Sequence, residues 1–266
     1  MEVEKIYLEK DNPEVFLEAY IADENSSSVR KAILIIPGGA YGKVEANREG
    51  EPIAMAFLER GYNAFVLHYT VGLKKPFPAQ LIEASMAVKH IKDNAEKYNI
   101  DPEEVFVAGF SAGGHLAGCL GILWNKKEIY DAVPMPYGYN KPKGMMLIYP
   151  VISGHLHLMS IKNLLCTKEP SKEELDTVSL ENYVSEDSAP LFLMHTSNDE
   201  IVDVRNALVL ATAYKENNKQ FELHIYPDAP HGVALANEVT MCGIEKWNNP
   251  QIARWVDDAV IWADTL

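Results

Sequence analysis

A pentapeptide centred on a serine is the part of the sequence best suited to nucleophilic chemistry. The residues GFSAG occupy positions 109–113, directly after the apolar run Val105–Ala108 and directly before a stretch that begins a helix. In this strand–turn–helix context the G-x-S-x-G pattern indicates a nucleophile elbow. Glycines flank the serine because a side chain beside so tight a turn would collide with neighbouring backbone. The free N–H groups at the start of the helix point at the same place. We therefore predict that Ser111 attacks a carbonyl carbon.

A glycine-rich loop upstream is suited to stabilise the negative charge that such an attack creates. The residues PGGAY at 37–41 follow the apolar run Ala32–Ile36, and glycines let backbone N–H groups approach an oxyanion closely. The alternative is a plain turn at the end of a strand. Tyr41, beside these groups, is predicted to contact the substrate, where its ring would cap an acyl pocket and limit its depth. We predict that the oxyanion is bound by the N–H groups of Gly39, Ala40 and Ala112.

An acid and a histidine should follow the serine in that order, each after a later strand. Asp199 comes shortly after the run Leu191–His195, where the acid is expected. Three other carboxylates are weaker candidates: Glu200, Asp203 and Asp187. Asp203 would begin or cap the next helix, and Asp187 precedes the strand instead of following it. His231 lies in a loop after the run Phe221–Tyr226 and is predicted to be the general base.

The other histidines fit this role less well. Three lie in strand runs and one on a helix face: His68, His195, His224 and His90. His115 flanks the elbow but sits four residues after Ser111 on the same helix, from which it cannot easily reach the serine. The pair His155 and His157 would suit a metal, yet no carboxylate or cysteine cluster accompanies it. We expect no metal and no cofactor.

The elements that must position these residues alternate along the chain. Apolar, β-branched or aromatic runs recur, and most are continuous, as in strands that are covered on both faces. They are Val15–Ile21, Ala32–Ile36, Ala64–Tyr69, Val105–Ala108, Met145–Tyr149, Leu191–His195 and Phe221–Tyr226. Between them amphipathic stretches predict helices over Ile53–Arg60, Ala79–Tyr98, Val204–Asn217 and Gln251–Ala263. This alternation predicts a single α/β domain over residues 1–266, with a doubly wound, mostly parallel sheet.

One long connection interrupts the alternation. About 40 residues separate the strand that ends near Pro150 from the next one at Leu191, and within them Ser171 and Glu174 have the spacing of a capping box. An insertion at the carboxyl end of a strand would lie over the rim of the site, so residues 151–189 are predicted to be a small cap. The alternative is an ordinary connection that packs away from the site.

Composition restricts the partners and the location. The 266 residues carry a formal net charge of −14, which argues against nucleic acid or an anionic membrane, because both need a basic surface. Three cysteines without a C-x-x-C pair indicate reduced thiols. The N-terminal residues lack the pattern of a signal peptide, and no apolar run has the ~18–20 residues that span a bilayer. We expect a cytoplasmic protein that acts on a small molecule. Its oligomeric state is left open, with a homodimer as one option.

The motif residues resemble the esterase and acetyl esterase branch of the α/β-hydrolases, which includes acetylxylan-esterase-like proteins and sugar hydrolases. The similarity extends over nearly the whole length, through Pro37–Gly42, Asn47–Pro52, Phe65–Tyr69, Gly109–His115, His195–Asp199 and Pro230–Gly232. The chain departs from relatives of the hormone-sensitive-lipase type, which have histidine where it has Pro37, and from similar proteins that often have proline where it has Asp203. Both departures leave the predicted catalytic groups in place, although each could alter the geometry of its loop.

The resemblance implies an α/β-hydrolase fold of about eight strands with a small cap. It also implies a serine carboxylesterase that acts on short-chain acyl esters, above all acetyl esters, through an acyl-enzyme. An O-acetylated sugar as substrate is implied by the resemblance alone. One alternative is an amide hydrolase of the same fold, of the formamidase or peptidase type. The other is a binding protein without catalysis, and such proteins usually lack one of the three groups that are present here.

Overall fold

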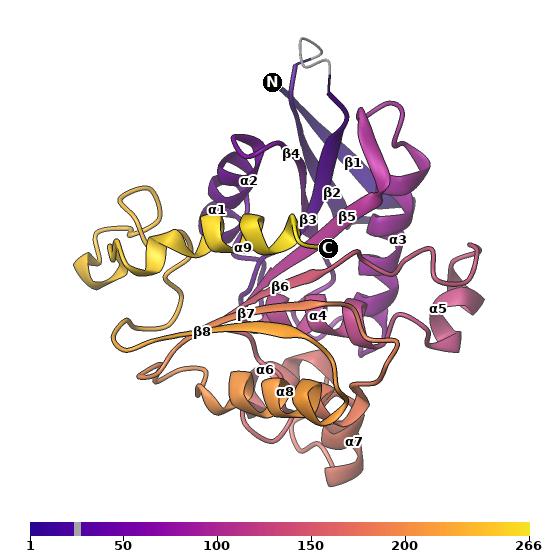
Figure 1. Cartoon of the computed structure of the whole chain (residues 1–266). Coiled ribbons are helices and arrows are strands. Elements are labelled where there is room, and N and C mark those ends of the chain that lie inside the picture. The colour runs from indigo at the N-terminus through magenta and orange to yellow at the C-terminus, as the bar shows by residue number, and fades with distance from the viewer. Residues whose placement is uncertain (24–27) are drawn as a thin grey trace.

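The computed structural model describes residues 1–23 and 28–266, and its centre is one eight-stranded sheet (Figure 1). The strand order is β1-β2-β4-β3-β5-β6-β7-β8. From β4 to β8 every neighbouring pair is parallel, whereas β2 pairs antiparallel with both β1 and β4. The predicted α/β fold with a mostly parallel sheet of eight strands is therefore confirmed. The strands are β1 (Glu2–Glu9), β2 (Asn12–Ile21), β3 (Arg30–Ile36), β4 (Tyr62–His68), β5 (Ile100–Phe110), β6 (Met145–Ile148), β7 (Leu191–Thr196) and β8 (Phe221–Tyr226).

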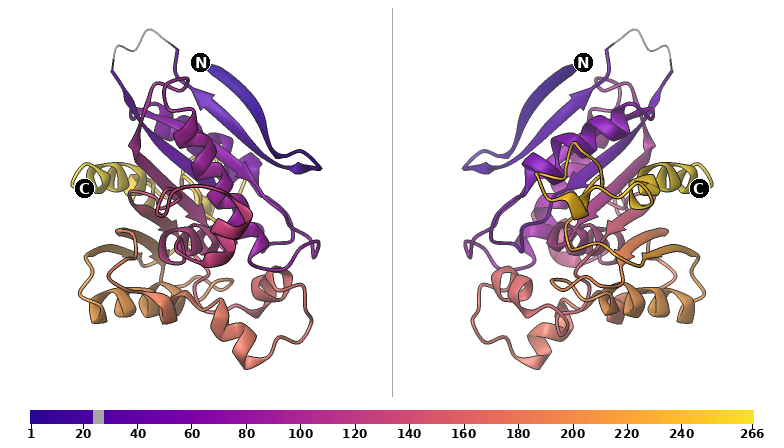
Figure 2. Two further views of the ribbon diagram at one scale, coloured as in Figure 1. Left: turned by 90° about the vertical axis from the view of Figure 1, so that its right-hand side faces the viewer. Right: turned by 90° about the vertical axis from the view of Figure 1, so that its left-hand side faces the viewer.

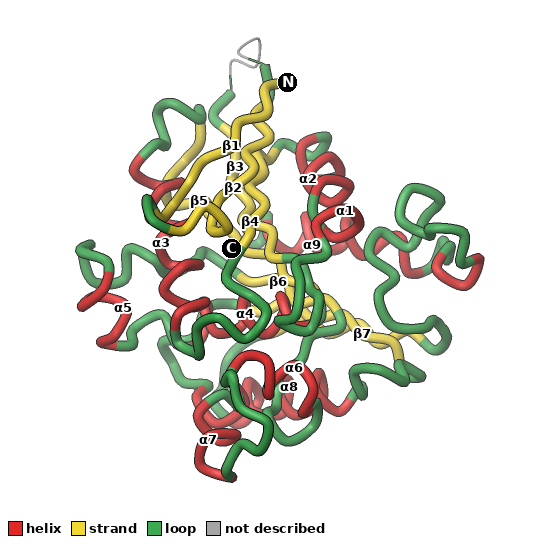
Figure 3. Tube along the Cα trace, turned by 180° about the vertical axis from the view of Figure 1, so that it is seen from behind, coloured by secondary structure: helices red, strands yellow, loops and turns green. Residues whose placement is uncertain are grey.

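Helices cover both faces of this sheet, which explains why its central strands are apolar throughout. In β3 the fully buried Leu34 and Ile36 join the core on one face, while Ile33 and Ile35 join the core on the other. The first core includes α3, α4 and α8, and the second includes α2 and α9. In Figures 1 and 3, α2 and α9 lie on one side of the strands and α3 lies on the other. Among the described residues, no helix combines the length and the apolarity needed to cross a bilayer.

The helices have the following bounds: α1 (Ala46–Glu49), α2 (Glu51–Leu58), α3 (Ala79–Asp93), α4 (Ala112–Ile122), α5 (Lys127–Ala132), α6 (Leu158–Leu164), α7 (Lys172–Thr177), α8 (Arg205–Glu216) and α9 (Trp255–Ala263). Short 3₁₀ turns occupy Leu180–Tyr183, Glu245–Trp247 and Ile252–Arg254. One predicted helix was too long. It ends at Asp93 rather than Tyr98, because Asn94 leaves the helical conformation and its side-chain amide donates to the carbonyl of His90, 2.8 Å away.

Residues 151–189 form α6, α7 and the first 3₁₀ turn. The predicted capping box is confirmed: the hydroxyl of Ser171 accepts from the N–H of Glu174, and the carboxylate of Glu174 accepts from the N–H of Ser171. The segment, salmon-coloured in Figure 2, lies at the lower end of the molecule, while the indigo strands β1 and β2 lie at its upper edge. It reaches the glycine-rich loop, because the amide of Asn163 donates to the carbonyl of Ala40 over 2.9 Å.

Candidate active site

The turn between β5 and α4 holds Ser111 in a strained conformation. Its φ of 54° and ψ of −118° lie outside the regions favoured by L-residues. Its N–H donates to the carbonyl of Ile148 over 3.1 Å, and its carbonyl accepts from the N–H of His115 over the same distance. The predicted need for glycines is confirmed. A Cβ at position 109 would lie 2.3 Å from the carbonyl oxygen of Gly113, and one at position 113 would lie 2.1 Å from that of Ile36.

Three side chains from different strand ends form one hydrogen-bonded chain. The Ser111 hydroxyl lies 2.9 Å from Nε2 of His231, and Nδ1 of His231 lies 2.6 Å from Oδ2 of Asp199. A carboxylate only accepts, so Nδ1–H donates to Asp199 and Nε2 is left to accept from the serine. The other oxygen of Asp199 accepts from the N–H groups of Ile201 and Val202, both at 2.9 Å. The structure thus brings together the predicted nucleophile, base and acid.

Asp199 is held in its ionised form although its side chain is fully buried. Burial raises the pKa of this carboxyl group, but the hydrogen bonds from His195 and His231, the charge on His231 and the N–H of Val202 outweigh burial. Together they hold the pKa well below its ordinary value. Nε2 of His195 lies 3.4 Å from Oδ2 of Asp199 and donates to the carbonyl of Val202 over 2.8 Å. The imidazole of His231 therefore faces a fixed negative charge.

The competing residues make other contacts. Asp203 accepts from the backbone N–H and the guanidinium of Arg205, each at 2.8 Å, and so serves the start of α8. His115 is buried beside the core, where its Nε2–H donates to the carbonyl of Val178 and its Nδ1 accepts from the hydroxyl of Tyr41, both at 2.8 Å. Burial lowers the pKa of His115 to about 4, although the bond to Val178 opposes this. Neither side chain bonds to the side chain of Ser111 or of His231.

The glycine-rich loop lies beside Ser111 and has two backbone N–H groups that donate to no acceptor among the described residues. Gly39 and Ala40 have φ of 119° and 55°, and both line the same hollow as Ser111. Neither N–H group donates to an acceptor within residues 1–23 or 28–266. Ala112 is the first residue of α4, so its N–H has no acceptor inside the helix. The three predicted donors are therefore unoccupied by the described chain.

Tyr41 does not take its predicted role. Only 1% of the residue is exposed, its ring packs edge-on against Tyr69 and His115, and its hydroxyl bonds to His115. With φ of 56° the backbone turns at this residue, and the side chain enters the core instead of the hollow. The interpretation of Tyr41 as a ring that caps the acyl pocket is wrong.

The hollow beside Ser111 is small and has a mixed lining. Its volume is about 240 Å³, and charged and apolar side chains share its wall: Lys43, Glu45, Arg48, Glu49, His157, Met159 and Ile201. His157 and Met159 belong to segment 151–189, so this segment forms part of the wall. Burial, and next the charge on His231, lower the pKa of His157. The neutral form of this imidazole is therefore favoured in the wall of the hollow.

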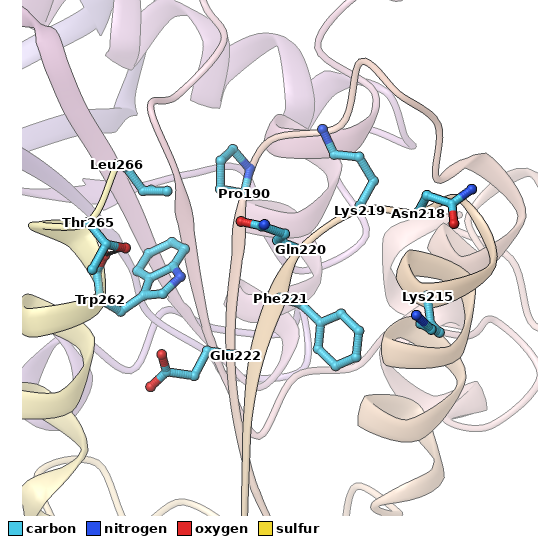
Figure 4. A pocket seen from close by; sticks show the side chains of 10 residues that line it. All are labelled: Pro190, Lys215, Asn218, Lys219, Gln220, Phe221, Glu222, Trp262, Thr265 and Leu266. Carbon is cyan, nitrogen blue, oxygen red and sulfur yellow. Dashed lines mark hydrogen bonds between the residues drawn. The ribbon is translucent and has the colours of Figure 1, made fainter.

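A larger hollow of about 880 Å³ lies away from this chemistry. It is open between the end of α8, the start of β8 and the end of α9, and Figure 4 shows the ring of Phe221 toward α8 and the carboxylate of Glu222 near Trp262. Pro190, directly before β7, also lines it, so it lies at the amino ends of the strands. None of the side chains around it belongs to the hydrogen-bonded chain of Ser111. Size therefore does not locate the active site in this molecule.

Several residues around the site were not predicted from the sequence. Arg48 and Glu49 lie within the segment that carries the family resemblance, but nothing in their residue types assigns them a role. Tyr149 and Trp247 lie far from them along the chain, and only the fold brings these four side chains together. His195 lies in β7, four residues before Asp199, and from the sequence alone it resembles an ordinary strand residue.

Comparison with known proteins places the chain in a defined group. The model of the BD-FAE family matches residues 17–214. Endo-1,4-beta-xylanase B of Butyrivibrio fibrisolvens is 36% identical over 233 residues, which are 85% of this chain and 36% of the xylanase. Acetylxylan esterase of Xylanibacter ruminicola is 29% identical over 217 residues, 79% of this chain and 42% of the esterase. This chain therefore spans less than half of the length of either relative.

A solved structure matches almost end to end. The acetyl ester-xyloside bifunctional hydrolase from Caldicellulosiruptor lactoaceticus superposes with a TM-score of 0.83 and 33% identity. The match covers 98% of this chain and 96% of that hydrolase.

Proposed function

The chain belongs to the BD-FAE family and has the α/β-hydrolase fold, and on this basis we propose that it is a serine carboxylic ester hydrolase of short-chain acyl esters. The observation that carries the proposal is the unbroken hydrogen-bonded chain from the Ser111 hydroxyl through His231 to the buried carboxylate of Asp199. It stands at the carboxyl ends of three strands, where open α/β sheets bind ligands.

In the proposed mechanism, Ser111 attacks the ester carbonyl while Nε2 of His231 accepts its proton. Asp199 keeps the imidazole in the required tautomer and stabilises the imidazolium that forms. The oxyanion is bound by the backbone N–H groups of Gly39, Ala40 and Ala112. The alcohol leaves with the proton from His231, and water then hydrolyses the acyl-enzyme by the same route. No cofactor takes part.

The proposed substrate is an acetyl ester, with an acetylated sugar as the preferred class. A hollow of about 240 Å³ is smaller than the ~300–1,000 Å³ typical of ligand pockets, which favours a small substrate with a short acyl group. Its charged wall suits a hydroxylated leaving group, because such a group can replace the hydrogen bonds that water makes there. Two similar proteins are named as an acetylxylan esterase and an acetyl ester-xyloside hydrolase, which supports the same class of substrate.

The experiment that tests the proposal joins labelling to kinetics. A fluorophosphonate probe should label the wild-type protein at Ser111, and Ser111→Ala should abolish the labelling and lower kcat on an acetyl ester by roughly 10⁴–10⁶, because the three groups act as a unit. Retention of more than a tenth of the turnover by a folded Ser111→Ala protein would refute the assignment. Matched ester and anilide substrates separate an esterase from an amide hydrolase, and we expect the ester to be cleaved far faster.

We also propose a reducing compartment, the cytoplasm, on the evidence of the thiols. Cys119 is buried, Cys166 half-buried and Cys242 exposed, and all three are free. Titration of the protein from its own cells, unfolded without added reductant, should give three thiols per chain. A lower number would indicate an oxidising compartment.

A further inference from the structure

An ion pair between the half-buried Arg48 and the buried Glu49 separates the glycine-rich loop from the loop that carries the histidine. Arg48 and Glu49 end the single turn of α1, and Glu49 is only 3% exposed. The arginine Nη2 lies 3.7 Å from Oε1 of the glutamate. Burying a carboxylate is unfavourable unless hydrogen bonds replace its water, and a buried ion pair by itself is weak evidence of stabilisation. The partners of this pair therefore show what it does.

One oxygen of Glu49 holds the glycine-rich loop. Oε2 accepts from the N–H of Gly38 over 2.8 Å. A Cβ at position 38 would lie 2.8 Å from this oxygen and 3.0 Å from Cβ of Ser111. Gly38 is thus wedged between the glutamate and the nucleophile. The residue that follows, Gly39, carries the first of the proposed oxyanion donors, so the position of Gly38 fixes the direction of that N–H.

The rest of the pair holds the histidine loop. Oε1 of Glu49 accepts from the hydroxyl of Tyr149 over 2.9 Å, and this hydroxyl accepts from the N–H of Ala234 over 3.0 Å. The ring of Tyr149 lies edge-on to His231, with centroids 5.0 Å apart. On the other side Arg48 donates to the carbonyl of Gly232.

An indole completes the contacts with this loop. The guanidinium of Arg48 lies 4.1 Å from the ring centre of Trp247, whose N–H donates to the carbonyl of His231 over 3.0 Å. The two side chains therefore contact Gly38 in the glycine-rich loop, Gly232 in the histidine loop, and Tyr149 and Trp247, which both contact the histidine loop in turn.

We propose that Glu49 is a positioning residue for the ester hydrolysis proposed above: it holds the oxyanion donors of the glycine-rich loop in register with His231. Burial raises the pKa of Glu49, and the charge on Arg48, the N–H of Gly38, the hydroxyl of Tyr149 and the charge on His231 oppose that rise. The carboxylate does not contact the reacting atoms. It acts through Gly38 on one side and through Tyr149 on the other.

Loss of this contact should weaken binding of the transition state more than binding of the substrate. Removal of an oxyanion donor lowers kcat by about 10²–10³, and a donor that is displaced rather than removed should lower it less. We expect Glu49→Ala to lower kcat about 10–100-fold with KM changed less than about threefold. Glu49→Gln keeps the shape and one acceptor for Gly38, and its amide can donate to Tyr149, so it should retain most of the activity that alanine loses.

The experiment compares these variants with a matched buried glutamate. Glu83 is 1% exposed and likewise accepts from one backbone N–H and one hydroxyl, both of Thr70. We expect Glu83→Gln to lower the melting temperature but to change kcat by less than about threefold.

Steady-state kinetics on an acetyl ester would be measured together with the Ki of methylboronic acid. In its adduct the Ser111 oxygen bonds to boron, the serine proton passes to His231, and the tetrahedral boron becomes anionic. The Ki should rise in Glu49→Ala by the factor by which kcat/KM falls.

The outcomes separate this proposal from the proposed function. The positioning role is overturned if a folded Glu49→Ala protein keeps kcat within threefold of wild type, or if Glu83→Gln lowers kcat as much as Glu49→Ala does. In either case, if Ser111→Ala abolishes the activity, the proposed esterase function still stands. If the wild-type protein has no activity that depends on Ser111, both the proposed esterase function and the positioning role of Glu49 are overturned. If neither Glu49 variant folds, Tyr149→Phe, which removes only the bridging hydroxyl, should lower kcat several-fold, and an unchanged kcat overturns the role.

Discussion

At the scale of single residues, two aspartates four positions apart have opposite roles because their hydrogen-bond partners differ. Asp199 is enclosed, and its oxygens accept from His231 and from the N–H groups of Ile201 and Val202. The side chain of Asp203 is 41% exposed and bonds to Arg205 at the start of α8. A carboxylate that is buried beside an imidazole can stabilise the imidazolium, whereas an exposed one at a helix start stabilises only the helix.

This difference predicts unequal effects of the same substitution. Asp199→Asn should lower kcat by about 10³–10⁴, because an amide at this position favours the wrong tautomer of His231. Asp203→Asn, the matched control, should lower kcat less than tenfold. Steady-state kinetics on one acetyl ester measure both. If Asp203→Asn proved the more damaging, the acid would lie one helical turn further along the chain than the geometry indicates.

The sequence predicts those site residues whose position follows from a strand end. Ser111, Asp199 and His231 each come within five residues of the end of an apolar run, so their meeting at one edge follows from the parallel sheet. The direction of the Tyr41 side chain does not follow in this way, because it depends on the left-handed backbone of residues 39–41. The role of Glu49 likewise does not follow from the sequence. A glutamate next to an arginine is ordinary on a helix surface, and only the packing of α1 between two loops buries it.

At the scale of elements, α4 connects the nucleophile to segment 151–189 through a buried histidine. His115 lies one turn into α4, donates to the carbonyl of Val178 and accepts from Tyr41. Its pKa is lowered to about 4, mainly by burial. The folded state therefore keeps this imidazole neutral over a pH range in which the unfolded chain binds a proton.

The consequence is a loss of stability on acidification. With an ordinary pKa of about 6.5, unfolded His115 binds its proton as the pH falls below that value, whereas the folded protein does so only near pH 4. The difference is worth about 3 kcal/mol in all. Stability from this residue is complete above pH 6.5 and declines between pH 6.5 and 4.

A variant without the imidazole isolates this contribution. His115→Gln should be less stable than wild type at pH 7.5, and the gap between the two should narrow by about 2–3 kcal/mol at pH 4.5. Denaturant unfolding of both proteins at several pH values measures the gap, and titration of the other groups cancels in the comparison. Parallel curves would show that His115 titrates normally.

The strands and helices were predicted to the extent that their side chains are buried. Seven apolar runs mark seven of the strands, but β1 has no such run, because it is an edge strand with alternating exposure. Its place in the sheet depends on pairing with β2. The end of α3 was missed for a different reason, since the amide of Asn94 caps the helix while the apolar pattern continues beyond it.

At the scale of the whole molecule, the chemistry and a larger open hollow lie at opposite ends of the sheet. Ser111 follows the carboxyl end of β5, whereas the hollow of about 880 Å³ lies beside the residues before β7 and at the start of β8. The predicted fold is confirmed by the eight-stranded sheet, and the resemblance to acetyl esterases is confirmed by the similarity to an acetylxylan esterase and to an acetyl ester-xyloside hydrolase. Substrate preference could not be derived from the sequence, since it depends on a small hollow whose wall comes from five separate segments.

The size of this hollow leads to a prediction about acyl chain length. Acetyl and propionyl esters of small alcohols and sugars should be the best substrates, and octanoyl and longer esters should be poor. About 240 Å³ beside Ser111 leaves little depth for a chain, and the charged groups of Lys43, Glu45 and Arg48 on its wall would lose water to an apolar tail. In a deep apolar tunnel each added methylene would gain about 0.8 kcal/mol, roughly fourfold in kcat/KM. A series of p-nitrophenyl esters from two to eight carbons, measured beside acetylated sugars, should therefore show a maximum at two or three carbons and then a steep fall. A continuous rise to eight carbons would contradict the proposed acetyl esterase while leaving the roles of Ser111, His231 and Asp199 untouched.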